Sequence, residues 1–454
     1  MKVAEPPPPT NSLSKAWLIG LTAAGLVTLM AIGGAAFLAY SYLINSRANA
    51  SFIVPVFADE PTLNHIAFTG NDNNVWLVSP SGQNLRRLTE DGRGYRFPTW
   101  SPDGTQLAFL GRDEANDTVL YVSPTSQAAP TIVYQAELSN PFYLYWAPNS
   151  QAVTFLTQEP NSMSMRLADV KQPENSRLLE KGAPFYWAWS PQGDRLLMHV
   201  GGSRDTSAEA HLSFLPNRQD AQRVELDLAP GGFQAPMWSS DGQSFFYVGD
   251  SGEEEAIYKT NVETLEQSKV TNVDGFAFMI LSPDDEHIAY LQFEAGTRPP
   301  FGRAYLIDPS TTNRQQITDD LIASMYWSPD GKKLALLSVS HANEGPSAGI
   351  PNKIAGMALP LRQRIYLRWW IYEVETGTLE PLTSFPPTDA FLQTIPYFDQ
   401  YYHSLTFWSP DSRYFVVVKR EDETDAGQVW VYDTTTEESA RQIGEGRLAV
   451  WSWR

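Results

Sequence analysis

Short apolar runs recur from residue 61 to the end of the chain, and polar turn residues separate them. One kind of run ends in a large ring followed by Ser-Pro-Asp-Gly, as at 100–104 and 327–331. A second kind follows this turn, as at 106–110 (QLAFL), and a third comes later, as at 429–432 (VWVY). Their short length and their aromatic and β-branched content predict β-strands. The Ser-Pro-Asp-Gly order predicts a type I turn between the first two strands.

The turn motif marks a repeated unit of four short strands in about 45 residues. Its anchor positions are Trp100, Trp146, Trp189, Trp238, Leu281, Trp327, Trp408 and Trp451. Successive anchors are separated by 46, 43, 49, 43, 46, 81 and 43 residues. Such a repeat is typical of β-propeller blades, which bury their faces only against neighbouring blades. A ring that recurs at one fixed point of the repeat predicts packing between blades rather than a single site.

The first and last copies are incomplete in complementary ways. Copy one begins at 65–68 (HIAF), directly at its second strand, and the chain ends in a lone first strand at 447–454 (RLAVWSWR). We therefore expect the C-terminal strand to close blade one, which removes exposed strand edges. The sequence predicts an all-β, eight-bladed β-propeller over residues 61–454. Both ends of the propeller should lie on the face that carries the Ser-Pro-Asp-Gly turns.

A different pattern precedes the repeats. Residues 16–44 carry no charged side chain, and as a helix they would extend about 43 Å, enough to span a bilayer. Lys2 and Lys15 precede this segment and Arg47 follows it, which weakly places the N-terminus inside. The alternative is a cleaved signal peptide, for which 48–50 (ANA) is a suitable site. We expect a short Pro-rich cytoplasmic tail at 1–15, a transmembrane helix at 16–44 and a linker at 45–60.

Composition limits the chemistry. The 33 Lys and Arg against 52 Asp and Glu give a formal charge of −19, which argues against nucleic acid as a partner. No cysteine is present, so disulfides, thiolate metal sites and thiol nucleophiles are excluded. The apolar fraction of 42% is enough for a large packed core.

The repeat resembles a known family. Trp-Ser-Pro-Asp-Gly, an Ile-Ala-Phe-like strand and an Arg-Leu-Thr strand end are similar to the TolB-type, WD-like bacterial β-propeller repeat. The resemblance covers about residues 61–454 and implies a propeller that lies outside the cytoplasm. It is poor evidence for activity, because the family includes periplasmic interaction proteins, propeller domains of serine peptidases and some lyases. The α/β domain that precedes the TolB propeller has no counterpart here, and the apolar segment stands in its place.

Catalytic motifs lack their structural context. The match to G-x-S-x-G at 345–349 lies in a polar stretch with no strand before it and no helix after it. Six histidines are scattered over the copies without paired metal-ligand spacing, although a lyase-like site could still assemble them across blades. We therefore predict no catalytic, cofactor-binding or metal-binding residues. Enzyme activity is left uncertain and is less expected than binding.

Two long insertions lie in the seventh copy, at about 340–367 and 384–403, on the face opposite the turns. Long loops on a rigid scaffold are common places for function. The first insertion is locally basic, the preceding copy adds two arginines, and the second insertion is rich in aromatic side chains. The candidate partner-binding residues are Arg298, Arg303, Arg362, Arg364, Arg368, Phe398, Tyr401 and Tyr402. The alternative is that the aromatic residues pack onto their own blade and the arginines pair with the acidic surface.

Together these patterns predict a single-pass, membrane-anchored propeller on the extracytoplasmic side of a bacterial cell membrane, with its N-terminus inside. Its expected function is to bind a protein or peptide partner without catalysis, as a scaffold or accessory subunit. The alternative is a propeller hydrolase or lyase that acts on a carbohydrate or peptide in the central channel. A third class, a ligand-sensing ectodomain, is disfavoured because the short tail at 1–15 offers no output domain.

Overall fold

The computed structural model describes residues 64–454 except 127–128, 174, 183–184, 203–208, 233, 251, 253, 275, 294–299, 312, 341–364, 422–424 and 437–439. The predicted tail, transmembrane helix and linker at 1–60 lie outside the described residues. Within the described part, no helix has the length and apolar character to cross a membrane. The described residues belong to one compact unit, residues 57–454.

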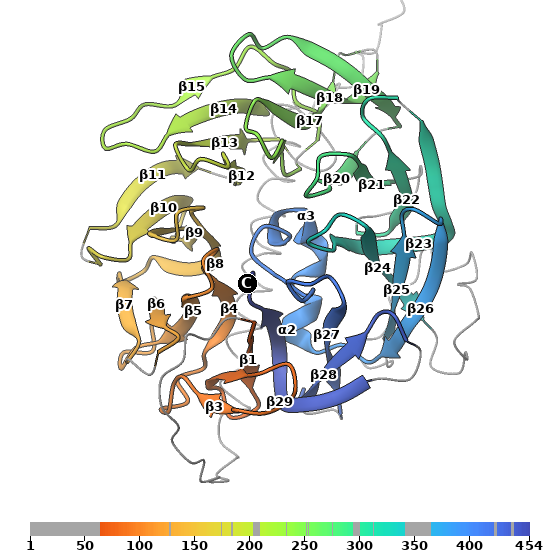
Figure 1. Ribbon diagram of the computed structural model, residues 1–454. Coiled ribbons are helices and arrows are strands. Elements are labelled where there is room, and N and C mark those ends of the chain that lie inside the picture. The colour runs from red at the N-terminus through yellow and green to blue at the C-terminus, as the bar shows by residue number, and fades with distance from the viewer. Residues whose placement is uncertain are drawn as a thin grey trace, which may run out of the picture. The chain divides into compact units, whose positions relative to one another are not determined.

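Four antiparallel sheets each contain four consecutive strands, which we call a blade. In each blade the first strand lies innermost in the ring of sheets, and the following strands succeed one another outward (Figure 1). The strands are β4 (Arg96–Trp100), β5 (Gln106–Arg112), β6 (Thr118–Pro124) and β7 (Thr131–Tyr134); β8 (Asn140–Trp146), β9 (Ala152–Gln158), β10 (Met163–Asp169) and β11 (Arg177–Gly182); β12 (Phe185–Trp189), β13 (Arg195–Val200), β14 (His211–Pro216) and β15 (Val224–Glu225); β16 (Met237–Trp238), β17 (Ser244–Asp250), β18 (Glu255–Asn261) and β19 (Gln267–Val273).

Two larger sheets arise because a long strand continues from one blade into the next. In the seven-stranded sheet, β23 pairs with β22 through its first half and with β24 through its second half. In the six-stranded sheet, β29 does the same between β28 and β1. The strands are β20 (Ala277–Leu281), β21 (Ile288–Gln292), β22 (Gly302–Ile307), β23 (Arg314–Trp327), β24 (Lys333–Ser340), β25 (Tyr366–Glu373) and β26 (Thr378–Phe385); β27 (Tyr414–Arg420), β28 (Gly427–Asp433), β29 (Ala440–Trp451), β1 (Ile66–Gly70), β2 (Val75–Val78) and β3 (Arg86–Arg87).

The C-terminal strand closes the ring, as the incomplete first copy predicts. Residues Gly446 to Trp451 of β29 pair antiparallel with β1, from Gly70 to Ile66. The backbone N–H of Asn64 donates to the carbonyl of Arg454, so the two described ends lie together. Because Ser452 follows the anchor Trp451 where other copies begin their turn, both ends lie on the turn face, as predicted.

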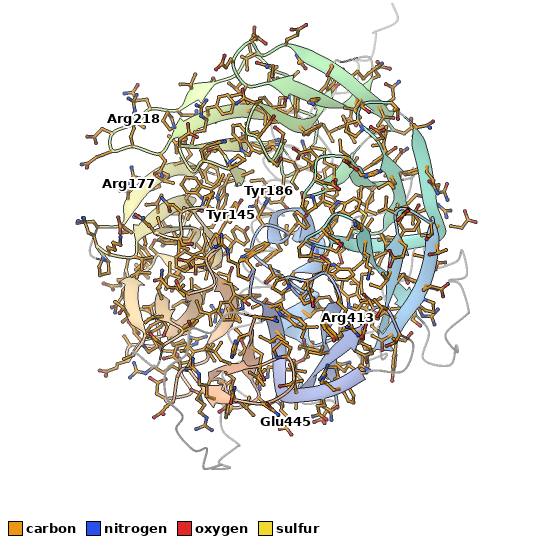
Figure 2. The ribbon with its side chains drawn as sticks, viewed as in Figure 1. Tyr145, Arg177, Tyr186, Arg218, Arg413 and Glu445 are labelled. Atoms are coloured by element: carbon orange, nitrogen blue, oxygen red, sulfur yellow. The ribbon has the colours of Figure 1, made fainter. Side chains whose placement is uncertain are left out.

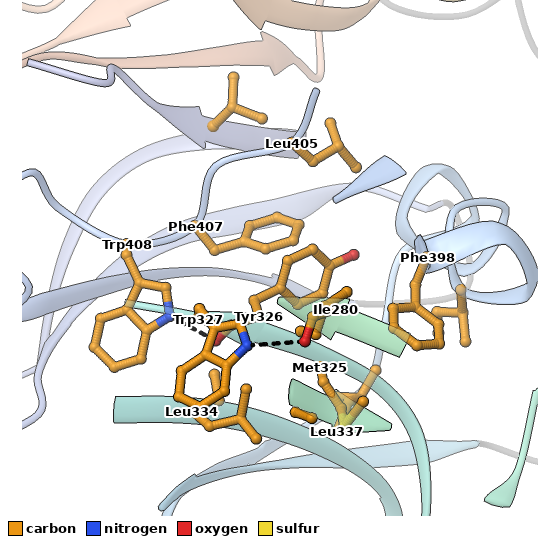
Figure 3. Close-up of a cluster of buried hydrophobic side chains, with 14 of the residues drawn as sticks. Ile280, Met325, Tyr326, Trp327, Leu334, Leu337, Phe398, Leu405, Phe407 and Trp408 are labelled. Carbon is orange, nitrogen blue, oxygen red and sulfur yellow. Dashed lines mark hydrogen bonds between the residues drawn. The ribbon is translucent and has the colours of Figure 1, made fainter. Parts of the chain in front are cut away.

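The anchor tryptophans connect neighbouring blades, which confirms their predicted structural role. Five of them donate from the indole N–H to the carbonyl of the residue just before the anchor of the adjacent blade, and Figure 3 shows two of these bonds. The pairs are Trp100 to Val450 (3.2 Å), Trp146 to Thr99 (3.1 Å), Trp238 to Ala188 (3.1 Å), Trp327 to Ile280 (3.4 Å) and Trp408 to Tyr326 (3.0 Å). Trp189 instead donates to the hydroxyl of Thr154, at 3.3 Å.

The predicted turns form even where the motif departs from Ser-Pro-Asp-Gly. The turn serine donates to the aspartate carboxylate and accepts the N–H that opens the next strand, as Ser328 does with Asp330 and Lys333. The last turn position needs a positive φ, which glycine adopts without steric cost. Gly331 has φ +71°, and Ser150 and Asp285 adopt +58° and +63° at the equivalent position.

The second insertion fills the centre of the ring, where Figure 1 shows its helices surrounded by the sheets. It contains α2 (Asp389–Leu392), the 3-10 helix η1 (Ile395–Tyr397) and α3 (Phe398–Tyr401). We call residues 386–405 the plug. It leaves β26 on the face opposite the turns and runs through the channel to the first strand of the next blade, which contains Trp408.

Candidate functional site

Gln400 of the plug binds the exposed backbone edge of an innermost strand. Such an edge has unpaired N–H and C=O groups, because only one side of the strand faces its own blade. The Gln400 side chain accepts the N–H of Trp187 at 3.0 Å and donates to the Trp187 carbonyl at 3.1 Å. It also donates to the hydroxyl of Tyr143 at 3.0 Å, and that hydroxyl donates back to the Gln400 carbonyl at 2.8 Å. One buried side chain thus joins two blades.

Further plug residues bind innermost segments around the ring. The carboxylate of Asp399 accepts the N–H of Ala235 at 2.8 Å, and Thr99 donates from its hydroxyl to the Ser404 carbonyl at 2.8 Å. Plug rings contact the channel wall through the pairs Phe398–Phe278, Tyr401–Phe97, Tyr401–Tyr143, Tyr402–Tyr326, His403–Tyr145 and Phe391–Trp369. The plug is therefore part of the core and not a surface loop.

The hollow that remains is a cavity of about 520 Å³ between the plug and the turns. We call it the funnel. Its wall is apolar and consists mainly of the anchor side chains and turn prolines of successive blades, Trp100, Trp146, Trp189, Trp238, Leu281, Trp327, Trp408, Pro102, Pro148, Pro191, Pro283, Pro329 and Pro410. Its volume lies within the range of about 300–1,000 Å³ that is usual for ligand pockets.

The last plug residues form the floor of the funnel. Tyr402, His403 and Leu405 line it, and Trp453 lines it at the position where most other blades have a turn proline. The imidazole of His403 stacks on Tyr145 at 5.1 Å. Burial lowers the pKa of His403 to about 4, so the floor is uncharged at neutral pH. Figure 2 shows Tyr145 and Tyr186 toward the centre of the ring, whereas Arg177 and Arg218 lie at its periphery.

Carboxylates surround the funnel just beyond its apolar wall. They are the turn aspartates Asp103, Asp194, Asp241, Asp284, Asp330 and Asp411. Burial would raise the pKa of Asp103 and Asp330, but hydrogen bonds from turn hydroxyls and backbone amides outweigh it and lower both. The hydrogen bond from Ser239 likewise lowers the pKa of Asp241. Asp103, Asp241 and Asp330 are therefore ionised at neutral pH. We call the six turn aspartates the acidic rim.

Basic residues of the same turn segments only partly offset this charge. Lys333 and Arg413 bind the outer-strand carboxylates Glu373 and Asp433, at 3.6 and 2.7 Å. Arg195 and Lys332 are the other basic residues in these segments, against six rim carboxylates. The turn face therefore presents an apolar hollow inside a net negative rim.

The predicted partner-binding residues do not form one surface. Arg298, Arg362 and Arg364 lie outside the described residues, so their role stays a prediction. Arg303 donates to the Asp319 carbonyl within its own blade. Tyr401 is partly buried against Phe97 and Tyr143, and Tyr402 lines the funnel.

Two of the predicted surface residues are buried, which corrects the expectation. Phe398 is 0% exposed and packs on Phe278. Figure 3 shows Phe398 in the cluster of buried hydrophobic side chains. Arg368 is 2% exposed, and its guanidinium donates to Ser384 at 2.9 Å and to Ser340 at 3.3 Å. The physical reasons differ: Phe398 belongs to the plug that fills the channel, whereas Arg368 lies on β25 and is buried by side chains of the adjacent strands β24 and β26. Neither side chain is available to another protein in this conformation.

Sequence reasoning missed the funnel, although its residues were identified. The anchors were interpreted only as contacts between blades, and the turn prolines only as turn formers. Because most copies place one ring and one proline at the same radius, their repetition implies an apolar lining around the axis on the turn face. That inference was available from the repeat alone.

The plug begins at a titratable contact, which gives a testable pH dependence. The carboxylate of Asp425 accepts the N–H of Asp389 at 2.7 Å. Burial raises the pKa of Asp425 to about 6. The folded state thus binds a proton more tightly than the unfolded chain, so this group's contribution is complete below about pH 4 and is lost as pH rises through 6.

We expect Asp425→Asn to remove this dependence. Relative to the wild type, the variant should gain about 1–2 kcal/mol in unfolding free energy between pH 4 and pH 7, allowing for partial solvent screening. Asparagine retains an oxygen for the Asp389 N–H, so the loop contact should persist. Denaturant unfolding at several pH values measures the difference. Parallel wild-type and variant curves would contradict the assignment.

Metal-binding side chains do not converge in the part of the chain that the structure describes: no group of three or more His, Asp or Glu there is placed to hold an ion. The central position where the channel enzyme was envisaged is occupied by plug side chains.

No protein-family model matches the chain, and no curated protein matches its sequence. Solved structures do match. A eukaryotic initiation factor is 11% identical, with 86% of this chain and 98% of that chain covered and a TM-score of 0.50. Oligogalacturonate lyase from Vibrio parahaemolyticus is 12% identical, with 82% and 97% covered and a TM-score of 0.48. TolB from Acinetobacter baumannii is 15% identical, with 84% and 78% covered and a TM-score of 0.39.

The chain folds as a β-propeller. Identities this low concern the fold alone. Function must therefore be argued from the plug, the funnel and the rim.

Proposed function

We propose that the protein is a non-catalytic binding propeller, and that the funnel receives an apolar segment of a protein partner flanked by basic residues. The observation that carries the proposal is the funnel itself. With the plug filling the channel, the apolar cavity on the turn face is the concave site that the described residues build.

The charge pattern supports a protein segment over a small molecule. Among the funnel-lining residues the charged side chain is Asp285, whose carboxylate already accepts from the N–H and hydroxyl of Ser240. The rim carboxylates lie outside the cavity, so only an occupant longer than the cavity reaches them. An apolar stretch with lysine or arginine on both sides satisfies the wall and the rim together.

The architecture and location complete the proposal. Counting β23 and β29 in two blades each, with the segment around Trp408 as a first strand, gives eight blades. We propose that residues 16–44 anchor this ring to the membrane, with the propeller on the extracytoplasmic side. The enzymatic alternative would need its chemistry where the plug now lies.

A peptide titration of the full-length chain tests this function. The probe is a nine-residue peptide of five apolar residues with two arginines at each end, and the readout is intrinsic tryptophan fluorescence, because six anchor indoles line the funnel. We expect a saturable change. Thr406→Trp, which narrows the funnel, should weaken binding about tenfold or more.

The control is an equal substitution away from the funnel. Thr378→Trp, at an exposed position on β26, should bind the peptide as the wild type does. Absence of saturable binding, or equal affinity in all three proteins, would remove the funnel as the site.

A further inference from the structure

A second charged feature lies at the opposite end of the ring, next to the plug. Arg96 begins β4, and Arg112 ends β5. Arg96 pairs with Leu110 across the two strands, so Arg112 is its diagonal neighbour on the same face, at the spacing of about 7–8 Å that is usual for diagonal pairs. The two arginines thus lie beside each other, and Arg96 also lies near the plug residue Tyr401.

Neither guanidinium has a carboxylate partner among the described residues. Arg96 donates to the hydroxyl of Thr118 at 3.4 Å, and Arg112 to the Asn116 carbonyl at 3.1 Å. Among the carboxylates of the adjoining loops, Asp91 and Glu114 lie within ion-pair distance of Arg93, and Asp113 accepts from Gln135. Most of the N–H donors of the two guanidinium groups are therefore available to a ligand.

Burial makes this arrangement costly without an anion. Burial, together with the charge of Arg112, lowers the pKa of Arg96 to about 10. Arg96 nevertheless remains charged at neutral pH. A desolvated charge beside a like charge is normally compensated by an opposite one.

The backbone next to Arg96 is strained. Phe97 has φ +52°, which is unfavourable for a bulky residue, and its ring contacts Tyr401 at 6.1 Å. The strand register shifts between Arg96 and Thr99. Bulges of this kind redirect side chains and are common beside functional sites.

We propose that Arg96 and Arg112 bind one oxyanion group, a carboxylate or a phosphate, at the end of the ring opposite the turns. The planar guanidinium suits both through paired hydrogen bonds. This site is independent of the funnel and has the opposite charge preference.

Thermal unfolding of the full-length chain at constant ionic strength tests the proposal. The probes are inorganic phosphate, a short acetylated peptide with a free C-terminal carboxylate, and the same peptide as its C-terminal amide, with chloride as the baseline. We expect saturable stabilisation by phosphate, by the free peptide or by both, and none by the amide. The responding probe identifies the source of the oxyanion.

Arg96→Met should reduce the affinity for the responding probe about tenfold or more, and Arg112→Met should also reduce it. Arg112→Met keeps the test valid if Arg96→Met folds poorly. The control is Arg218→Met, at an exposed position on the periphery, which should bind as the wild type does. Stabilisation by neither oxyanion, or unchanged affinity in both Arg96→Met and Arg112→Met, would overturn the site.

Discussion

Replacing Gln400 with alanine should lower the free energy of unfolding by about 2–4 kcal/mol, one of the two largest effects that we expect. The change removes three side-chain hydrogen bonds at 3.0–3.1 Å. It also leaves the N–H and carbonyl of Trp187 and the hydroxyl of Tyr143 buried with lost partners. A buried donor or acceptor that loses its partner destabilises the fold by more than a formed hydrogen bond stabilises it, so the loss for Gln400→Ala is large. Denaturant unfolding followed by fluorescence measures it.

The matched control is Gln393→Ala in the same insertion. Gln393 is exposed, so its truncation should change the unfolding free energy by less than about 0.5 kcal/mol. If the two variants lost equal stability, the plug would not be the part of the core described above. If Gln400→Ala lost nothing, its contacts with two blades would have no energetic role.

Replacing Trp100 with alanine should cost about 3–5 kcal/mol in unfolding free energy. Trp100 is 1% exposed, and its indole N–H donates to the Val450 carbonyl at 3.2 Å. The substitution therefore leaves a cavity and an unpaired carbonyl where the closing strand meets the next blade. Thermal or denaturant unfolding gives the loss directly.

Natural variation within the chain supplies the comparison for Trp100. Leucine occupies the equivalent anchor at 281, so Trp100→Leu should lose less than Trp100→Ala. Trp453→Ala should lose less again, because this ring is 40% exposed. A loss for Trp453→Ala equal to that for Trp100→Ala would contradict the structural role of the anchor.

The repeat could be predicted from the sequence because its determinants are local. Ser328, Asp330 and Gly331 form their turn with hydrogen bonds inside five residues, so the motif specifies it directly. The closing strand was also predictable. The first copy has no first strand and the chain ends in a first strand with no blade of its own, so the C-terminal strand must complete the first blade.

The plug could not be predicted in the same way. The number of aromatic side chains in 384–403 is the same whether Phe398 covers a surface or fills a channel. Which of the two occurs depends on the unpaired backbone edge of β12, which is far away in sequence. The basic surface was predicted from local charge, yet Arg368 is buried by hydrogen bonds with Ser340 and Ser384 that no local pattern reveals. The pair Arg96 and Arg112 could not be predicted, because it depends on the register between β4 and β5 and not on sequence spacing.

The two ends of the propeller have opposite chemical character in this account. The turn face carries the apolar funnel inside the acidic rim, and the other end carries the two unneutralised arginines. The plug separates them, so a ligand at one end does not reach the other through the channel. The two sites can therefore be tested with separate probes and separate variants.

The most direct test of the central claim is site-specific crosslinking with the arginine-flanked apolar peptide. A photoreactive side chain replaces either Trp453, which lines the funnel, or Tyr397, a plug residue that is 45% exposed and does not line it. We predict that light attaches the peptide at position 453, that unlabelled peptide competes, and that position 397 gives only background. Equal labelling at both positions, or none at 453, would contradict the funnel as the binding site.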